Sequence, residues 1–151
     1  MPTPPPRDPA QRKQDTLDRL RHDVDCWVAS ADEAGTPYLV PLSFDWDGDS
    51  LLIATSAASP TGRNLQAGRT VRLGVGETRD VVLIEGVVVD VVAAQDLPAH
   101  EGDAFADRTD FDPGTLTGYS YFHIRPRRIQ AWREANELAG RDLMREGRWL
   151  A

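Results

Sequence analysis

The chain has 151 residues, with 17 basic and 24 acidic side chains and a formal net charge of -7. This is the length of one domain with its own core, and the acidic balance argues against nucleic-acid binding, which needs a basic surface. The sequence contains no run of about 20 apolar residues to span a membrane, and no apolar segment resembling a signal peptide follows its start. A single cysteine, Cys26, excludes an internal disulfide. We therefore expect a cytoplasmic protein.

The chain divides into a short tail and one domain. Residues 1–9 are rich in proline, and we expect a flexible tail there. The remaining residues, 10–151, are expected to form a single domain. Leu17 and Leu20 recur at helical spacing, so residues 10–22 are expected to form a helix.

Beyond residue 25 the apolar residues alternate with a period of two, which is typical of strands. Strands are expected over 26–31, 37–46, 50–55, 71–75, 81–92 and 119–132. Pro41 predicts a sheet edge or a bulge, and Gly86 predicts a bulge in a bending strand. The result is a mainly β fold of six or seven mostly antiparallel strands joined largely by hairpins, which favours a small closed or split β-barrel.

Helical patterns are fewer and shorter. A short helix is expected to end at Gly68, and another is expected over residues 96–108. The spacing of Leu138, Leu143 and Met144 is weakly helical in an otherwise ambiguous C-terminal segment.

Common site motifs fail on spacing. The acidic run Asp45–Asp49 lacks the glycine and glutamate positions of a calcium loop, and the three histidines lie too far apart to predict a metal site. A basic run, Arg125–Arg128, is broken by Pro126 and continues into an apolar segment. It indicates a strand edge rather than a nucleic-acid site.

One loop has the chemistry of an anion site. It leaves a strand at Thr55 and enters a helix that carries Arg63 near its start. The free N–H groups of a helix start, the hydroxyls of Ser59 and Thr61, and a guanidinium would together suit a phosphate monoester. A capped helix start open to solvent is the alternative that remains.

The order of these features resembles the pyridoxamine 5'-phosphate oxidase-like family of flavin-binding split β-barrels, over about residues 15–151. The features are the strand Tyr38–Phe44, the strand Ile53–Thr55, the hydroxyl-rich loop, a bent strand with Glu85-Gly86, and a late strand ending in Ile129-Gln130-Ala131-Trp132. The resemblance implies a homodimer that holds FMN between its two subunits and acts on a small-molecule substrate.

The resemblance also implies which residues contact the cofactor. Those bordering the isoalloxazine would be Val40, Pro41, Leu42 and Ser43 on one edge, and Ile53, Ala54 and Thr55 on the other. Those at the phosphate and ribityl chain would be Ser59, Thr61, Arg63 and Asn64, and Trp132 would reach the cofactor from the partner subunit. Thr61 stands where the family usually has lysine, and residues 138–142 lack the family's arginine- and histidine-containing substrate grip.

The function expected from the resemblance is an FMN-dependent oxidoreductase that transfers hydride through flavin N5 and does not act on pyridoxine phosphate. Because the cofactor carries this chemistry, no acid–base pair or nucleophile triad is required. Two alternatives remain: a reductase that uses a deazaflavin coenzyme, and a non-catalytic dimer that stores or senses flavin or a tetrapyrrole.

Overall fold

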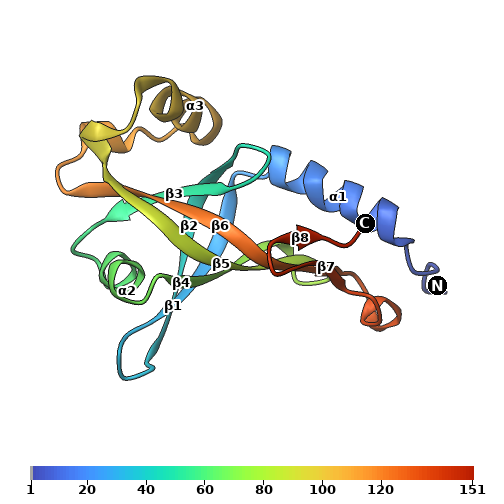
Figure 1. The fold of residues 1–151 in the computed structure, drawn as a ribbon. Helices are drawn as coiled ribbons and strands as arrows, with labels where there is room; N and C mark the ends of the chain where they lie inside the picture. Colours follow the sequence, from blue (N-terminus) through green and yellow to red (C-terminus); the bar gives the residue numbers. More distant parts are fainter. Residues whose placement is uncertain (1) are drawn as a thin grey trace.

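The computed structural model describes residues 2–151, and its main feature is a closed barrel of six antiparallel strands. Neighbouring strands follow the order β3-β2-β1-β4-β5-β6, and β6 pairs back with β3 (Figure 1). The strands are β1 (Asp25–Ala31), β2 (Pro37–Trp46), β3 (Leu51–Ser56), β4 (Thr70–Glu77), β5 (Asp80–Ala93) and β6 (Tyr119–Trp132). The predicted mainly β barrel is confirmed, with strand ends within about two residues of those expected.

Three α-helices accompany the barrel: α1 (Pro9–His22), α2 (Pro60–Gly68) and α3 (Ala99–Thr109). Helix α1 begins where expected because the Asp8 side chain caps it, accepting a hydrogen bond from the N–H of Gln11 at 2.8 Å. Helix α2 ends at Gly68 as predicted, but the left-handed residue that follows the helix is Arg69, with φ of 61°. None of the helices in residues 2–151 is long and apolar enough to cross a membrane.

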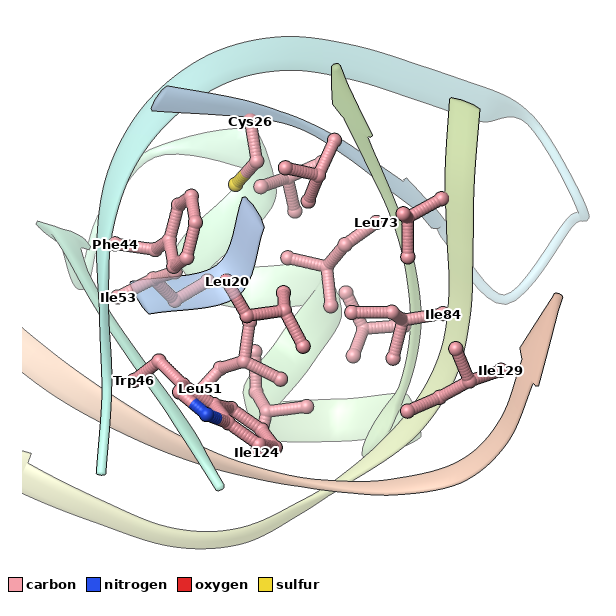
Figure 2. Close-up of a cluster of buried hydrophobic side chains, with 14 of the residues drawn as sticks. Leu20, Cys26, Phe44, Trp46, Leu51, Ile53, Leu73, Ile84, Ile124 and Ile129 are labelled. Carbon is pink, nitrogen blue, oxygen red and sulfur yellow. The ribbon is translucent and has the colours of Figure 1, made fainter. Parts of the chain in front are cut away.

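The main core fills the barrel interior. Figure 2 shows Phe44, Leu73, Ile84 and Ile129 pointing inward from four different strands. Leu20 of α1 lies among them and is fully buried, so the helix is held by the same core as the strands. This packing is the reason that the period-two pattern identified the strands so well, since one face of each strand lies in the core.

Although β3 and β6 close the barrel, the ladder between β2 and β3 is incomplete. We call the resulting opening along residues 37–43 of β2 the split. This strand pairs with β1 over residues 37–43 but with β3 only over residues 44–46. The outer edge of residues 37–43 therefore has no neighbouring strand, and Pro41 lies within it. This location confirms the prediction from Pro41, because a residue without an N–H is tolerated at an open edge.

The long strands β5 and β6 bend together at a bulge between Glu85 and Gly86, as Gly86 predicted. A Cβ atom at Gly86 would lie 2.5 Å from Cγ2 of Ile124, so the close approach of the two strands requires glycine there.

Helix α3 and the 3₁₀ turn η1 (Ala94–Asp96) cover the outer face of β3 and β6 and form a second, smaller core. Phe105 of α3 is fully buried, and its ring meets Tyr121 of β6 edge to face, with the centroids 5.4 Å apart. A helix was expected over residues 96–108; the observed α3 starts three residues later because η1 and Pro98 precede it.

The weak helical pattern of the C-terminal segment was misleading. Residues 135–137 form the 3₁₀ turn η3 (Ala135–Glu137), and two short strands follow, β7 (Asp142–Arg145) and β8 (Arg148–Trp149). Strand β3 pairs only with the first half of β6, and β7 pairs with its second half at Ile129 and Gln130. A strand forms here because it covers backbone groups that β6 would otherwise leave open.

The N-terminal segment, expected to be a flexible tail, contacts this C-terminal region. The carbonyl oxygen of Pro4 accepts a hydrogen bond from Nδ2 of Asn136 at 2.8 Å. Arg7 donates to Glu137 from its backbone N–H, Nε and Nη2, over distances of 2.7–2.9 Å. These hydrogen bonds join residues at least 130 positions apart in the chain.

Candidate functional site

The loop between β3 and α2 is the best-defined candidate site, and Ser59 organises it. The Ser59 hydroxyl caps α2 by accepting a hydrogen bond from the N–H of Gly62 at 3.0 Å. It also donates to the carbonyl oxygen of Ser56 at 2.7 Å. The Ser59 hydroxyl thus both donates and accepts a hydrogen bond inside the loop. This is the capped helix start that the sequence analysis gave as the alternative to an anion site.

Gly62 allows the first turn of α2 to pack directly on this loop. An added Cβ atom would lie 2.3 Å from the carbonyl oxygen of Ser56 and 2.9 Å from that of Ala57. Both contacts are with backbone, which cannot swing aside as a side chain can. Glycine at this position therefore sets the distance between the loop and the helix start.

Most of the N–H groups at the start of α2 are occupied or absent. Pro60 has none, Gly62 donates to Ser59 Oγ, and Arg63 donates to the Ser59 carbonyl oxygen at 2.9 Å. Among residues 2–151 this leaves the N–H of Thr61 as the first-turn donor without a protein acceptor. The helix start thus has one unused backbone N–H, on a residue that is only 2% exposed, where an uncapped helix would offer about four.

Arg63 supplies the positive charge at this end of α2. Its side chain is exposed and folds back over the loop, donating from Nη1 to the carbonyl oxygen of Ala58. No carboxylate of residues 2–151 lies within 4.0 Å of its guanidinium, so its charge is not neutralised by the protein. An exposed guanidinium without a carboxylate partner is suited to bind a phosphate oxygen.

The other predicted phosphate and ribityl contacts also gather here. Oγ1 of Thr55 lies 3.5 Å from Oγ of Ser59, and Nδ2 of Asn64 donates to Oγ of Ser30 on β1 at 3.1 Å. Thr61 is 2% exposed, so almost all of the residue lies in the interior. The structure thus brings together Thr55, Ser59, Thr61, Arg63 and Asn64.

The four predicted residues of β2 do not share one face. Val40 and Leu42 are half-buried and pack against the barrel core, at the part of β2 whose edge is open. Pro41 and Ser43 face outward, and the hydroxyl of Ser43 donates to Asp25 at 2.9 Å. Only Val40 and Leu42 therefore border the split of the barrel with their side chains.

Ile53 and Ala54 of β3 are buried on opposite faces of the sheet. Ile53 is 0% exposed in the main core, and Ala54 is 4% exposed in the core beneath α3. Their side chains contact other parts of this chain, and neither presents a surface to the split.

Trp132 lies far from this loop in the same chain. Tyr119 of β6 pairs with Ser56, and Trp132 is thirteen residues further along the strand. At about 3.3 Å per residue, the strand covers roughly 40 Å between them, less the effect of its bends. Trp132 therefore lies at the opposite end of β6 from the residue that pairs with this loop. Its ring is covered on one side by the Arg141 guanidinium, 5.8 Å from the ring centre.

The sequence did not identify an apolar strip on the outer face of the barrel. Cross-strand pairing places Pro41, Trp27, Gly74 and Leu83 in one row across β2, β1, β4 and β5. Trp27 is 53% exposed and Leu83 is 38% exposed. The sequence did contain a signal for this strip. In each strand these residues alternate with core residues, so they face outward.

Cys26 is buried within the barrel. Burial, with a smaller contribution from Asp25, raises the pKa of the Cys26 thiol to about 12, so the reactive thiolate is scarce. No group of three or more metal-ligating side chains occurs in the part of the chain that the structure describes.

The pyridoxamine 5'-phosphate oxidase family model matches residues 14–133. The chain belongs to this family. No curated protein matches it.

Solved structures share the fold at low sequence identity. An F420 reductase is 20% identical, with 74% of this chain and 93% of that chain covered and a TM-score of 0.62. A putative pyridoxamine 5'-phosphate oxidase from Listeria innocua is 14% identical, with 83% and 98% covered and a TM-score of 0.64. The haem storage protein HutZ from Vibrio cholerae is 16% identical, with 79% and 93% covered and a TM-score of 0.65.

Proposed function

We propose that the protein is an FMN-dependent oxidoreductase that acts on a small organic substrate in the cytoplasm. The observation that carries this proposal is Arg63, a guanidinium without a carboxylate partner at the capped start of α2. Membership of the pyridoxamine 5'-phosphate oxidase family supports it. When bound, FMN would supply the hydride chemistry, so the chain needs no catalytic nucleophile of its own.

The residues at the split fit the parts of such a cofactor. Arg63 would bind the phosphate and neutralise part of its charge. Val40 and Leu42 would exclude water from one side of the ring system, since they are half-buried beside an open strand edge. Ile53 and Ala54 would contribute backbone rather than side chains, because both side chains are buried elsewhere.

The proposal includes a homodimer. Trp132 lies at the opposite end of β6 from the residue that pairs with the loop before α2, and a second copy would bring it there. The outward-facing strip of Pro41, Trp27, Gly74 and Leu83 is an apolar surface of the kind that protein interfaces bury. A two-fold axis would place the same strip on both partners.

The proposed substrate is not pyridoxine phosphate. The only cation in residues 138–142 is Arg141, which donates to the carbonyl oxygen of Leu138 at 3.0 Å and lies over the Trp132 ring. It is thus partly engaged within the chain. We infer a substrate without a phosphate group in that position.

A deazaflavin coenzyme is the second candidate. Thr61 replaces the lysine that the family usually has and is buried, so the loop carries one positive charge fewer for the phosphate. The similarity to an F420 reductase adds support. The absorption spectrum of the purified protein separates the two, because bound FMN absorbs near ~450 nm and an oxidised deazaflavin near ~420 nm.

The same spectrum tests the non-catalytic alternative suggested by the haem storage neighbour, since haem would give a Soret band. Two of the three histidines have one ring nitrogen engaged within the chain. Nδ1 of His22 is within 2.7 Å of the Asp18 carbonyl oxygen, Nε2 of His123 is 3.3 Å from Glu101, and His100 lies on α3. A bound flavin that NADPH reduces and an acceptor reoxidises would support the enzyme; a flavin that no donor reduces would favour storage.

Arg63→Ala tests the phosphate role. It is expected to weaken FMN binding by roughly 1.5–3 kcal/mol, the range for a hydrogen bond to a charged partner. Arg21→Ala is the matched control, because it removes the same charge from an exposed position on α1. Titration of the flavin-free protein with FMN measures both affinities, and equal affinities in the two variants would contradict the role of Arg63.

Trp132→Ala tests the contribution of the second subunit. Native mass spectrometry should show a dimer that carries cofactor in the unaltered protein and a dimer that retains less cofactor in the variant. Full cofactor retention, or a monomer that binds cofactor as tightly, would refute the shared site.

A further inference from the structure

A groove of about 550 Å³ lies where β1 and β4 separate. It adjoins the proposed cofactor site at Ser30, which accepts a hydrogen bond from Asn64. The two strands pair only over residues 27–29 and 72–74. Beyond these positions, residues 30–31 of β1 and residues 70–71 of β4 border the groove without pairing to each other. Facing strand edges of this kind leave backbone N–H groups available, and such concave edges can bind anions.

The walls combine small apolar side chains with an excess of positive charge. The apolar residues are Ala29, Ala31, Val71 and Val87. The charged residues are Arg72, Glu85 and Arg127, which sum to +1. Nη2 of Arg72 lies 2.6 Å from Glu85, so these two charges largely cancel and the excess belongs to Arg127.

Arg127 is held in place by its backbone and is free at its side chain. It is the extra residue of the bulge, because Pro126 pairs with Gly86 and Arg128 with Glu85. Its carbonyl oxygen accepts a hydrogen bond from the N–H of Gly147 at 2.8 Å. Its guanidinium makes no ion pair and no hydrogen bond with any residue from 2 to 151.

The neighbouring arginine of the same basic run differs. Arg128 lies 3.1 Å from Asp142 and is neutralised by it. The bulge thus separates two adjacent guanidinium groups: that of Arg128 is ion-paired, and that of Arg127, a residue lining the groove, is unpaired and lies near Gly147. In a protein of net charge -7, such a local positive site is where an anion would bind.

We propose that this groove binds a small organic anion, with a phosphate or carboxylate group at Arg127 and a short apolar body between β1 and β4. The apolar walls would contact the body of the ligand, and the unpaired Arg127 guanidinium would bind its negatively charged group. The proposal does not depend on a cofactor at α2, which would use Arg63 on a different element.

Hexyl phosphate and hexanoate test the proposal, since they separate a phosphate from a carboxylate head group on one apolar body. Binding to the full-length protein is measured by calorimetry and by the backbone amide signals of Val71 and Val87 in NMR spectra. We expect at least one of the two to bind and to shift these signals. We expect hexanol and hexylammonium to bind at least tenfold more weakly, because they lack the negative charge.

Two variants and a matched control locate the site. Arg127→Gln is expected to weaken binding of the preferred anion roughly tenfold or more, and Ala31→Leu is expected to weaken it by occupying the mouth of the groove. Arg125→Gln removes the same charge from an exposed position of β6 that does not line the groove, so it should change the affinity less than about twofold. Circular dichroism confirms that each variant is folded.

Several results would overturn the proposal. One is the absence of binding by either anion, and another is equal affinity in the Arg127→Gln and Arg125→Gln proteins. Displacement of the anion by FMN would place it in the cofactor site instead. Failure of FMN to bind at all would refute the proposed function and leave this groove unaffected.

Discussion

The hydrogen bonds between Arg7 and Glu137 give the most quantitative prediction. Glu137 is 2% exposed and accepts four hydrogen bonds, three from Arg7 and one from the N–H of Arg133 at 2.8 Å. The Arg7 guanidinium chiefly, with the two backbone N–H groups, lowers the pKa of this carboxyl from 4.5 to about 2 against the opposing effect of burial. Lowering a pKa by this amount corresponds to about 3 kcal/mol of folding free energy.

Glu137→Gln should therefore destabilise the protein by about 3 kcal/mol near neutral pH, where the carboxylate is fully ionised. Because the folded-state pKa is the lower one, the stabilisation is present above about 4.5 and is lost as the pH falls towards 2. The difference between the unaltered protein and the variant should thus shrink by about 2 kcal/mol on going from pH 7 to pH 3.

Urea unfolding at a series of pH values measures this difference. Glu134→Gln is the control, because Glu134 makes one exposed ion pair, with Arg79 at 3.2 Å, and its removal should cost less than about 1 kcal/mol. A Glu137→Gln protein that is as stable as the control at pH 7, or whose loss of stability stays constant down to pH 3, would contradict this prediction.

Two further predictions concern the loop before α2 and the cysteine. Gly62→Ala should destabilise the protein by about 1–3 kcal/mol, because the new Cβ would overlap the Ser56 carbonyl oxygen. Gly68→Ala on the same helix is the control, because an added Cβ there meets nothing within 4 Å, and it should be neutral or stabilising. Thermal unfolding measures both variants. Equal losses of stability in the two would contradict the predicted overlap at Gly62. The Cys26 thiol, with its pKa raised to about 12, should react with a thiol reagent at pH 8 at least ~10³-fold more slowly in the folded protein than in denaturant; rates within tenfold of each other would show that the thiol is accessible.

The strands were predictable because alternation reports burial on one face, which is a local property of the chain. The pattern over residues 37–46 and 119–132 matches β2 and β6 to the residue. It failed for β7, where Leu143 and Met144 are adjacent and both buried, so no alternation is present to read.

The candidate site was predictable only in part. The loop chemistry around Ser59 and Arg63 follows from helix capping, which depends on residues close together in sequence. The positions of Ile53 and Ala54 could not be derived in this way, because α3 packs over the outer face of β3 from almost fifty residues away.

Residue order alone predicted a small antiparallel barrel, because apolar alternation reports strands. It also predicted an edge or a bulge at Pro41 and a bend at Gly86, because each depends on the hydrogen-bonding or steric limits of one residue type. Tertiary contacts decided the rest: which arginines are neutralised, which apolar residues remain exposed, and how Arg7 reaches Glu137. Pairing between distant residues depends on the register and bending of the whole sheet, and no local pattern encodes these.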